Sequence, residues 1–160
     1  MSQLIVESVG NVRLLNLPKT AFMCSRKVPA GIVLKCYDWA IEQREAGRCI
    51  ISGFHSTIEM DVLFYLLKGS QPIIAALHRG IGKEIQKQFA SYIDSGRLLV
   101  ISPFDRSRTR GGSREARIRN KLMIDLAEDV VIGHATPGGG LAVLLEQIDK
   151  PVHFVAGKSV

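Results

Sequence analysis

Six short apolar runs, separated by longer segments with helical periodicity, constrain the fold of this chain more than any other feature of its sequence. Each run is almost uninterrupted by polar residues. A continuous apolar run of this length is typical of a strand that is covered on both faces of its sheet. We therefore predict strands at residues 20–24, 49–52, 72–77, 98–101, 129–133 and 152–155.

The segments between these runs carry the signals of helices. Ser56 or Thr57 is placed to cap one helix, Ser113 is placed to cap another, and glycines end several of the patterns. The periodicity predicts helices at residues 30–46, 58–68, 83–95, 114–127 and 141–148. Strands that alternate with helices indicate an α/β fold of three layers, with a doubly wound, mainly parallel, Rossmann-like sheet of about six strands.

The length and composition of the chain are those of one ordinary globular domain, which we expect to span residues 1–160. Residues 1–17 hold two apolar runs broken by Gly10-Asn11 and predict a leading strand or hairpin. The sequence shows no secretory leader and no apolar run that would span a bilayer, so we expect a cytoplasmic protein without a membrane partner. Its three cysteines lack metal-type spacing and are interpreted as reduced thiols.

The positive charge of the chain is concentrated in one stretch. Lys and Arg exceed Asp and Glu by 21 to 15, and much of the surplus lies in residues 105–121, D-R-S-R-T-R-G-G-S-R-E-A-R-I-R-N-K. A local surplus of this kind favours polyanions or phosphates as partners. The alternative is a solvated basic loop, in which Arg106, Arg108 and Arg110 only face water.

Arg119 differs from the other arginines of this stretch. The predicted helix has an apolar stripe made of Ile118, Leu122, Met123 and Leu126, with Arg114, Arg117 and Lys121 on the opposite side. Arg119 lies beside the stripe, in the first turns of the helix, where backbone N–H groups favour an anion. Because an unpaired buried guanidinium is costly, we expect Arg119 to meet either a carboxylate of this chain or a phosphate.

The carboxyl ends of the predicted strands are where a doubly wound sheet binds its ligands. Glycine turns at these ends let a phosphate approach the backbone, and helix N-termini supply N–H donors. We therefore interpret this edge as a phosphate or nucleic-acid site. Its predicted residues are Ser25, Arg26, Gly53, His55, Arg79, Arg106, Arg108, Arg110, Arg119, Asn120, Lys121, Gly138, Gly139 and Gly140.

Histidines and aromatic residues at the same edge are candidates for metal ligands and for stacking platforms. His55, His78 and His134 each follow a predicted strand, but no cysteine or carboxylate accompanies them at ligand spacing, so we predict no metal and no cofactor. Phe54 and Phe104 are the ring residues expected at this edge. Proteins that bind single strands tightly use more such rings, so tight binding by a monomer is not expected.

Several short motifs occur in the order in which they appear in a known family. They are Ser25-Arg26, Ile50-Ile51-Ser52-Gly53, the run 73–77 with Gly80-Ile81, Arg119-Asn120-Lys121 followed by Asp129-Val130-Val131, Gly139-Gly140-Leu141, and Pro151-Val152. Over about residues 18–156 they resemble the Rossmann-like core of the DprA/Smf DNA-processing proteins, in the SLOG group. The resemblance implies binding of single-stranded DNA or a nucleotide, a recombination protein as a partner, and a homodimer or higher oligomer.

The chain also departs from that family. Residues 52–59, S-G-F-H-S-T-I-E, differ from the family's S-G-x-A-x-G-I-D, and the helical domains that flank the core in many members have no counterpart. We therefore expect a divergent, stand-alone core, for which a small-nucleotide sensor is one alternative function.

An enzyme is the other alternative. Residues 137–141, P-G-G-G-L, resemble part of the P-G-G-x-G-T-x-x-E motif of the lonely-guy phosphoribohydrolases, which belong to the same group. Leu141, Ala142 and Leu145 occupy that family's functional positions, and Glu146 stands one residue late. A nucleotide N-glycosidic hydrolase needs a correctly placed carboxylate, so this alternative depends on whether Glu146 reaches the site.

Overall fold

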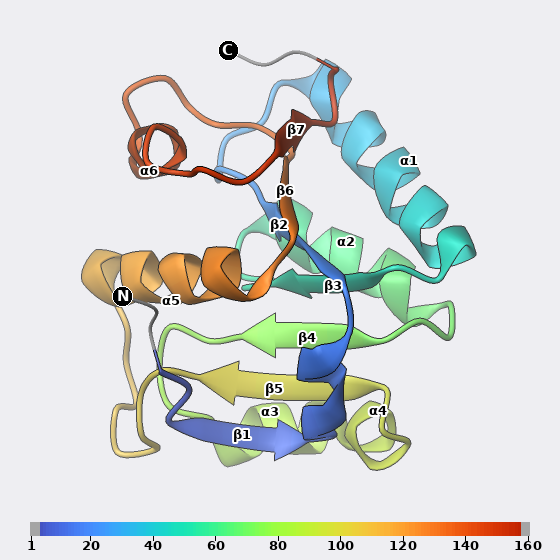
Figure 1. Ribbon diagram of the computed structural model, residues 1–160, viewed down its shortest axis with the longest axis vertical. Helices are drawn as coiled ribbons and strands as arrows, with labels where there is room; N and C mark the ends of the chain where they lie inside the picture. Colours follow the sequence, from blue (N-terminus) through green and yellow to red (C-terminus); the bar gives the residue numbers. More distant parts are fainter. Residues whose placement is uncertain (1–3, 158–160) are drawn as a thin grey trace.

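A seven-stranded sheet forms the middle layer of the computed structural model, which describes residues 4–157 (Figure 1). The strands are β1 (Glu7–Gly10), β2 (Lys19–Met23), β3 (Cys49–Ser52), β4 (Ile73–Ala76), β5 (Leu98–Ser102), β6 (Asp129–Ile132) and β7 (Val152–Phe154). Their order is β1-β5-β4-β3-β2-β6-β7, and β1 alone is antiparallel to its neighbour. The predicted fold class is confirmed, with β1 as a seventh strand beside the six that were expected.

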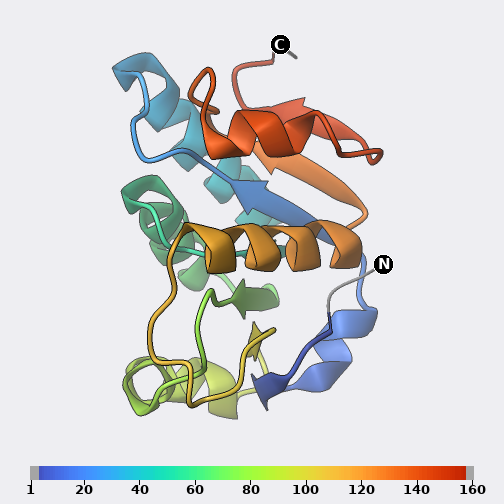
Figure 2. The same ribbon diagram turned by 90° about the vertical axis from the view of Figure 1, so that its left-hand side faces the viewer.

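Helices cover both faces of this sheet, as Figure 2 shows with the carboxyl ends of the parallel strands toward the viewer. They are η1 (Val12–Asn16), α1 (Ala30–Ala46), α2 (Thr57–Leu67), α3 (Lys83–Gln88), α4 (Ala90–Asp94), α5 (Ser113–Leu126) and α6 (Gly140–Leu145). The core on one face packs the sheet against α1, α2, α3 and α4, and the core on the other face packs it against η1, α5 and α6. This arrangement gives the three predicted layers.

Two of the helices begin or break where the sequence did not predict. The expected helix 83–95 is two short helices, because Phe89 leaves the helical conformation at φ −113° and ψ 20° and buries its ring. The cap of α5 is Gly112 rather than Ser113, and the Glu115 side chain accepts the Gly112 N–H at 2.9 Å. The cap of α2 is Ser56, and Glu59 completes a capping box with it.

The leading segment forms a strand followed by a 3₁₀ helix rather than a hairpin. Gly10 ends β1 with φ 120°, and a Cβ at this position would lie 2.5 Å from the Leu98 carbonyl oxygen. Asn11 then accepts the Arg13 N–H and starts η1, so no return strand forms. Residues 1–3 of the predicted segment lie outside the described part of the chain.

The strand order reverses between β2 and β6. From β2 the chain goes to β3, β4 and β5 on one side of the sheet, and it then returns to add β6 and β7 on the other side. Such a reversal leaves a crevice beyond the carboxyl ends of the two central strands, where ligands bind in open α/β sheets. Within residues 4–157, no helix is both long and apolar enough to cross a membrane.

Candidate functional site

A crevice of about 500 Å³ lies at this switch point. The end of β2, the N-termini of α2, α5 and α6, and the loops after β4 and β6 contribute to its wall. It is lined by Met23, Cys24, Ser25, Arg26, His55, Ser56, Glu59, His78, Gly111, Gly112, Ser113, Ala116, Arg119, Asn120, Thr136, Gly139, Gly140 and Leu141. Three helices therefore direct their N-terminal ends to one hollow, an arrangement that favours a negative charge there.

Some of the predicted site residues line the crevice, and the others lie elsewhere. Those that line the crevice are Ser25, Arg26, His55, Arg119, Asn120, Gly139 and Gly140. Gly138 lies in the turn before α6, while Gly53 and Arg79 line a neighbouring pocket. Arg106, Arg108 and Arg110 lie on the exposed loop before α5, and Lys121 lines a separate hollow between α5 and α6. The structure does not bring Lys121 to the crevice, although its neighbour Asn120 is there.

Arg119 is buried, with only 6% of its surface exposed, and it meets no carboxylate at ion-pair distance among the described residues. Its Nη1 donates to the Ala76 carbonyl oxygen at 3.2 Å, and its Nε donates to Asn120 Oδ1 at 2.8 Å. The structure gives Nη2 no hydrogen-bond partner within residues 4–157. Of the two expected partners, the internal carboxylate is therefore ruled out within this part of the chain, and both N–H groups of Nη2 remain unused.

The fit of Arg119 depends on Gly53. A Cβ at position 53 would lie 2.1 Å from Nη1 of Arg119, so only glycine leaves room for the guanidinium. Burial lowers the pKa of Arg119, and the negative charge of Glu59 partly offsets that effect. An arginine held in this way remains positively charged, because its ordinary pKa is far above neutral.

Glu59 is the carboxylate in the wall of the crevice, and both of its oxygens are already occupied. Oε1 accepts the N–H groups of His55 and Ser56 at 2.9 and 3.1 Å, and Oε2 accepts the Cys24 N–H at 3.0 Å. These bonds join the end of β2 to the start of α2, across 35 residues of sequence. Glu59 therefore shapes the site, a role that the sequence did not reveal.

The turn before α6 is tied to the loop that follows β2. Ser25 donates its N–H to the His134 carbonyl at 2.8 Å, and its Oγ accepts the Thr136 N–H at 3.0 Å. Gly138 takes the left-handed conformation, at φ 75°, that this turn requires. The predicted glycine turn is thus held against Ser25, with the start of α6 facing the crevice.

Two of the three histidines considered as ligands meet at the mouth of the crevice. The rings of His55 and His78 have centroids 4.5 Å apart and lie edge to face, while His134 is absent from the lining of the crevice. Burial, followed by the charge of Arg119, lowers the pKa of both imidazoles, in His78 to about 4. Both rings are therefore neutral near pH 7. The described residues contain no group of three or more side chains arranged to hold a metal.

The loop before α5 carries Arg106, Arg108 and Arg110, and we call it the arginine loop. It is fixed at its base and exposed at its tip. Gly80 donates its N–H to the Arg108 carbonyl at 2.7 Å, and a Cβ at Gly111 would lie 1.9 Å from the His78 carbonyl oxygen. Arg106 pairs with Glu7 at 3.8 Å, and Arg108 pairs with Glu115 at 3.2 Å. Arg110 is exposed, and no ion pair is formed by it within residues 4–157.

The two phenylalanines expected at this edge are not stacking platforms. Phe54 and Phe104 expose only 5% and 9% of their surface. Two serines that sequence reasoning missed hold them: Phe54 donates its N–H to Ser52 Oγ, and Phe104 donates its N–H to Ser102 Oγ. Phe54 also has a positive φ of 45°, which is unusual for a residue with a side chain.

Glu146 lies outside the crevice. It follows α6 as its C-cap, and it is exposed at the end of the helix opposite to the glycine turn. The carboxylate on which the hydrolase alternative depends is therefore not in the site.

Fold and crevice together define a doubly wound α/β protein with an electropositive hollow at its switch point. No family model matches the sequence, and no curated protein matches it significantly. Among solved structures, it is similar to DNA processing protein A (DprA) from Streptococcus pneumoniae, with a TM-score of 0.76 and 22% identity over 92% of this chain. The predicted resemblance to DprA is thus confirmed at the level of the fold.

Two further solved structures are similar to this chain. DNA processing protein A from Helicobacter pylori, described for its single-stranded DNA binding mode, matches with a TM-score of 0.73 and 21% identity over 92% of this chain and 69% of its own. The Moco carrier protein from Chlamydomonas reinhardtii matches with a TM-score of 0.57 and 14% identity over 86% of this chain and 75% of its own. The chain spans 53% of the S. pneumoniae protein.

Proposed function

We propose that the crevice at the switch point binds the phosphate of a nucleic acid or nucleotide, with single-stranded DNA as the first candidate. The observation that carries this proposal is Arg119, a buried guanidinium with two unused donors on Nη2 and no carboxylate partner in the described chain. A buried positive charge of this kind is best satisfied by an anion that enters from solvent. The single-stranded DNA binding of the H. pylori protein, which has a similar fold, supports the choice of DNA.

The crevice residues have distinct roles in this proposal. Arg119, Asn120 and Arg26 supply side-chain donors, and Gly140 presents its backbone N–H group at the start of α6. The Gly139 N–H is already donated to the Thr136 carbonyl at 3.0 Å, so Gly139 shapes the turn. Arg106, Arg108 and Arg110 stand on the adjoining loop, where they contact further phosphates of a longer strand without reading its sequence. Lys121 is left out of the proposed surface, because it faces the hollow between α5 and α6.

A small nucleotide is the second candidate. The burial of Phe54 and Phe104 favours it, because a surface for single strands normally offers exposed rings on which bases stack. A recombination protein as a further partner remains a prediction.

The test measures binding of a fluorescently labelled single-stranded oligonucleotide by anisotropy, with Arg119→Gln compared against Arg117→Gln. Arg117 is exposed on the same helix and lies outside the crevice, so both variants lose one charge. We expect Arg119→Gln to weaken binding about tenfold or more and Arg117→Gln to weaken it less than about threefold. Equal losses in two folded variants would remove the crevice from the binding surface.

A further inference from the structure

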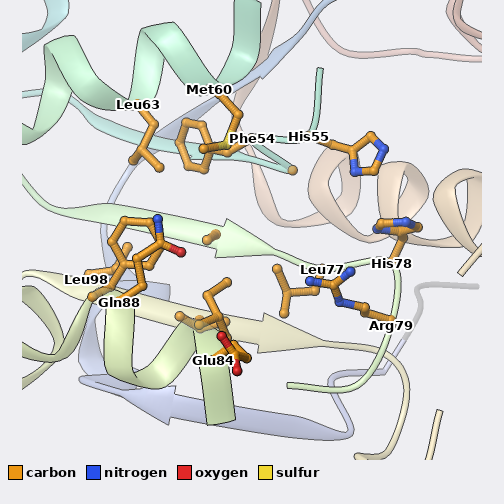
Figure 3. Close-up of a pocket in the computed structure, with 15 residues that line it drawn as sticks. Phe54, His55, Met60, Leu63, Leu77, His78, Arg79, Glu84, Gln88 and Leu98 are labelled. Carbon is orange, nitrogen blue, oxygen red and sulfur yellow. The ribbon is translucent and has the colours of Figure 1, made fainter. Parts of the chain in front are cut away.

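A second, apolar pocket lies beside the crevice and shares part of its wall (Figure 3). Its volume is about 200 Å³, and it is enclosed by the loop after β3, the end of β4, the first half of β5, and α2 and α3. Phe54, Met60, Leu63, Leu77, Phe89 and Leu98 form most of its surface. His55 and His78 line both hollows, so these two rings mark the boundary where the crevice meets the apolar pocket.

The polar groups of this pocket are few and lie at its rim. Figure 3 shows His55, His78 and Arg79 at the end nearest the crevice, with Glu84 and Gln88 on the α3 side. Glu84 and Gln88 are four residues apart on one helix, so their side chains lie on the same face. Glu84 offers only acceptors, whereas the Gln88 amide both donates and accepts.

The size of the pocket limits what it can take. Pockets for drug-sized ligands measure about 300–1,000 Å³, so a pocket of about 200 Å³ takes one ring system and not a whole nucleotide. Its apolar walls and its two polar groups on the α3 side, Glu84 and Gln88, match a flat heterocycle, which buries its faces and hydrogen-bonds through its edge. The imidazoles of His55 and His78 stand where the two hollows meet, and because they are neutral near pH 7 they do not repel such a ring.

We propose that this pocket holds one nucleobase of the ligand whose phosphate lies in the crevice, with Glu84 and Gln88 contacting the edge of the base. The proposal rests on the proposed function, because the phosphate site supplies the anchor from which the base enters. A base that presents N–H donors to Glu84, as guanine does, is favoured over one that presents only acceptors there. The base belongs either to a free nucleotide or to one nucleotide of a DNA strand.

Calorimetry with matched probes tests the pocket separately from the phosphate site. One pair is guanosine 5′-monophosphate and ribose 5-phosphate, and the other is a single-stranded oligonucleotide and its abasic counterpart. We expect the base-bearing member of at least one pair to bind about tenfold tighter or more, as burial of one ring system predicts. The pair that shows the difference identifies the source of the base.

Variants of α3 provide the second measurement. Gln88→Trp places a large side chain in the α3 wall of the pocket, and Lys87→Trp is its control, because Lys87 is exposed on the same helix and does not line the pocket. We expect Gln88→Trp to reduce binding of the base-bearing probe to the level of its base-free counterpart and to leave the latter unchanged.

The outcomes are distinguishable. Equal binding within both pairs, with the phosphates still bound, would overturn the nucleobase pocket and leave the phosphate site standing. No binding of any phosphate-bearing probe would overturn the proposed function and this inference with it. Equal effects of the two tryptophan variants would also contradict the assignment of the base to this pocket.

Discussion

At the scale of single residues, the site depends on two buried charges of opposite sign that do not pair. Glu59 is satisfied by three backbone N–H groups, and Arg119 is satisfied in part by a carbonyl and an amide oxygen. Because each charged side chain has its own hydrogen bonds, removal of one does not leave the other without hydrogen-bond partners. The structural cost of each substitution should therefore follow the bonds that it removes.

This difference predicts unequal losses of stability. We expect Glu59→Ala to lower the free energy of unfolding by roughly 3–5 kcal/mol, because three backbone donors lose a charged acceptor. Arg119→Ala removes one bond to the buried Ala76 carbonyl and one to the Asn120 amide, and it should cost only about 1–3 kcal/mol. Urea unfolding of the two variants measures both values. A larger loss for Arg119→Ala would show that this arginine is mainly structural.

The low pKa of His78 makes the stability of the folded protein depend on pH. Its pKa is about 4 in the folded protein and about 6.5 in the unfolded chain, so the unfolded state binds more protons between these values. Stability therefore falls as the pH drops from about 6.5 to about 4, and His78→Gln should remove that part of the dependence. Unfolding of both proteins across this range measures it. A difference between them that does not change with pH would contradict the low pKa.

At the scale of the elements, the sequence predicted the strands well because their apolar runs are covered on both faces. Strands β2 to β7 begin and end within one residue of their predicted bounds. The topology then explains why Ser25, His55 and Gly139 could be predicted to share one edge, since the parallel strands preceding them all end there.

The remaining features of the site depend on contacts that no local pattern encodes. The bonds of Arg119 to Ala76 and of Glu59 to Cys24 join residues 43 and 35 apart, so they appear only after the sheet has formed. Lys121 was grouped with Asn120 because they are adjacent, yet consecutive residues of a helix point about 100° apart. The break at Phe89 likewise follows from the burial of its ring rather than from local periodicity.

The arginine loop gives a prediction at this scale. The triple variant Arg106→Ala, Arg108→Ala and Arg110→Ala should weaken binding of single-stranded oligonucleotides of all sequences alike and flatten the dependence on salt. Each lost phosphate contact changes the slope of log K against log salt by about 0.7 for a single strand. The control removes the same charge from the exposed side of α5, through Arg114→Ala, Arg117→Ala and Lys121→Ala. An unchanged slope in the loop variant would exclude the loop from the interface.

At the scale of the whole molecule, the sheet ends in two edges. Among the described residues, β1 pairs only with β5, and β7 pairs only with β6. Leu4 and Val6, next to β1, expose 78% and 54% of their surface. Unpaired edges and exposed apolar side chains favour association with another chain.

We therefore expect a homo-oligomer at micromolar concentration. Light scattering coupled to size exclusion gives the mass directly, and dilution should shift it toward that of one chain. A mass of 17.6 kDa, that of a single chain, at micromolar concentration would contradict this expectation.

The central claim is that phosphate binds at the switch point between β2 and β6. Amide chemical shifts recorded during titration with a single-stranded oligonucleotide, and in parallel with guanosine 5′-monophosphate, test it most directly. We expect the largest changes for at least one ligand at Ser25, Asn120, Gly139 and Gly140, and little change at Lys121 and Gln147, in the hollow between α5 and α6. Changes confined to residues outside the crevice for both ligands, with these four amides unmoved, would contradict it.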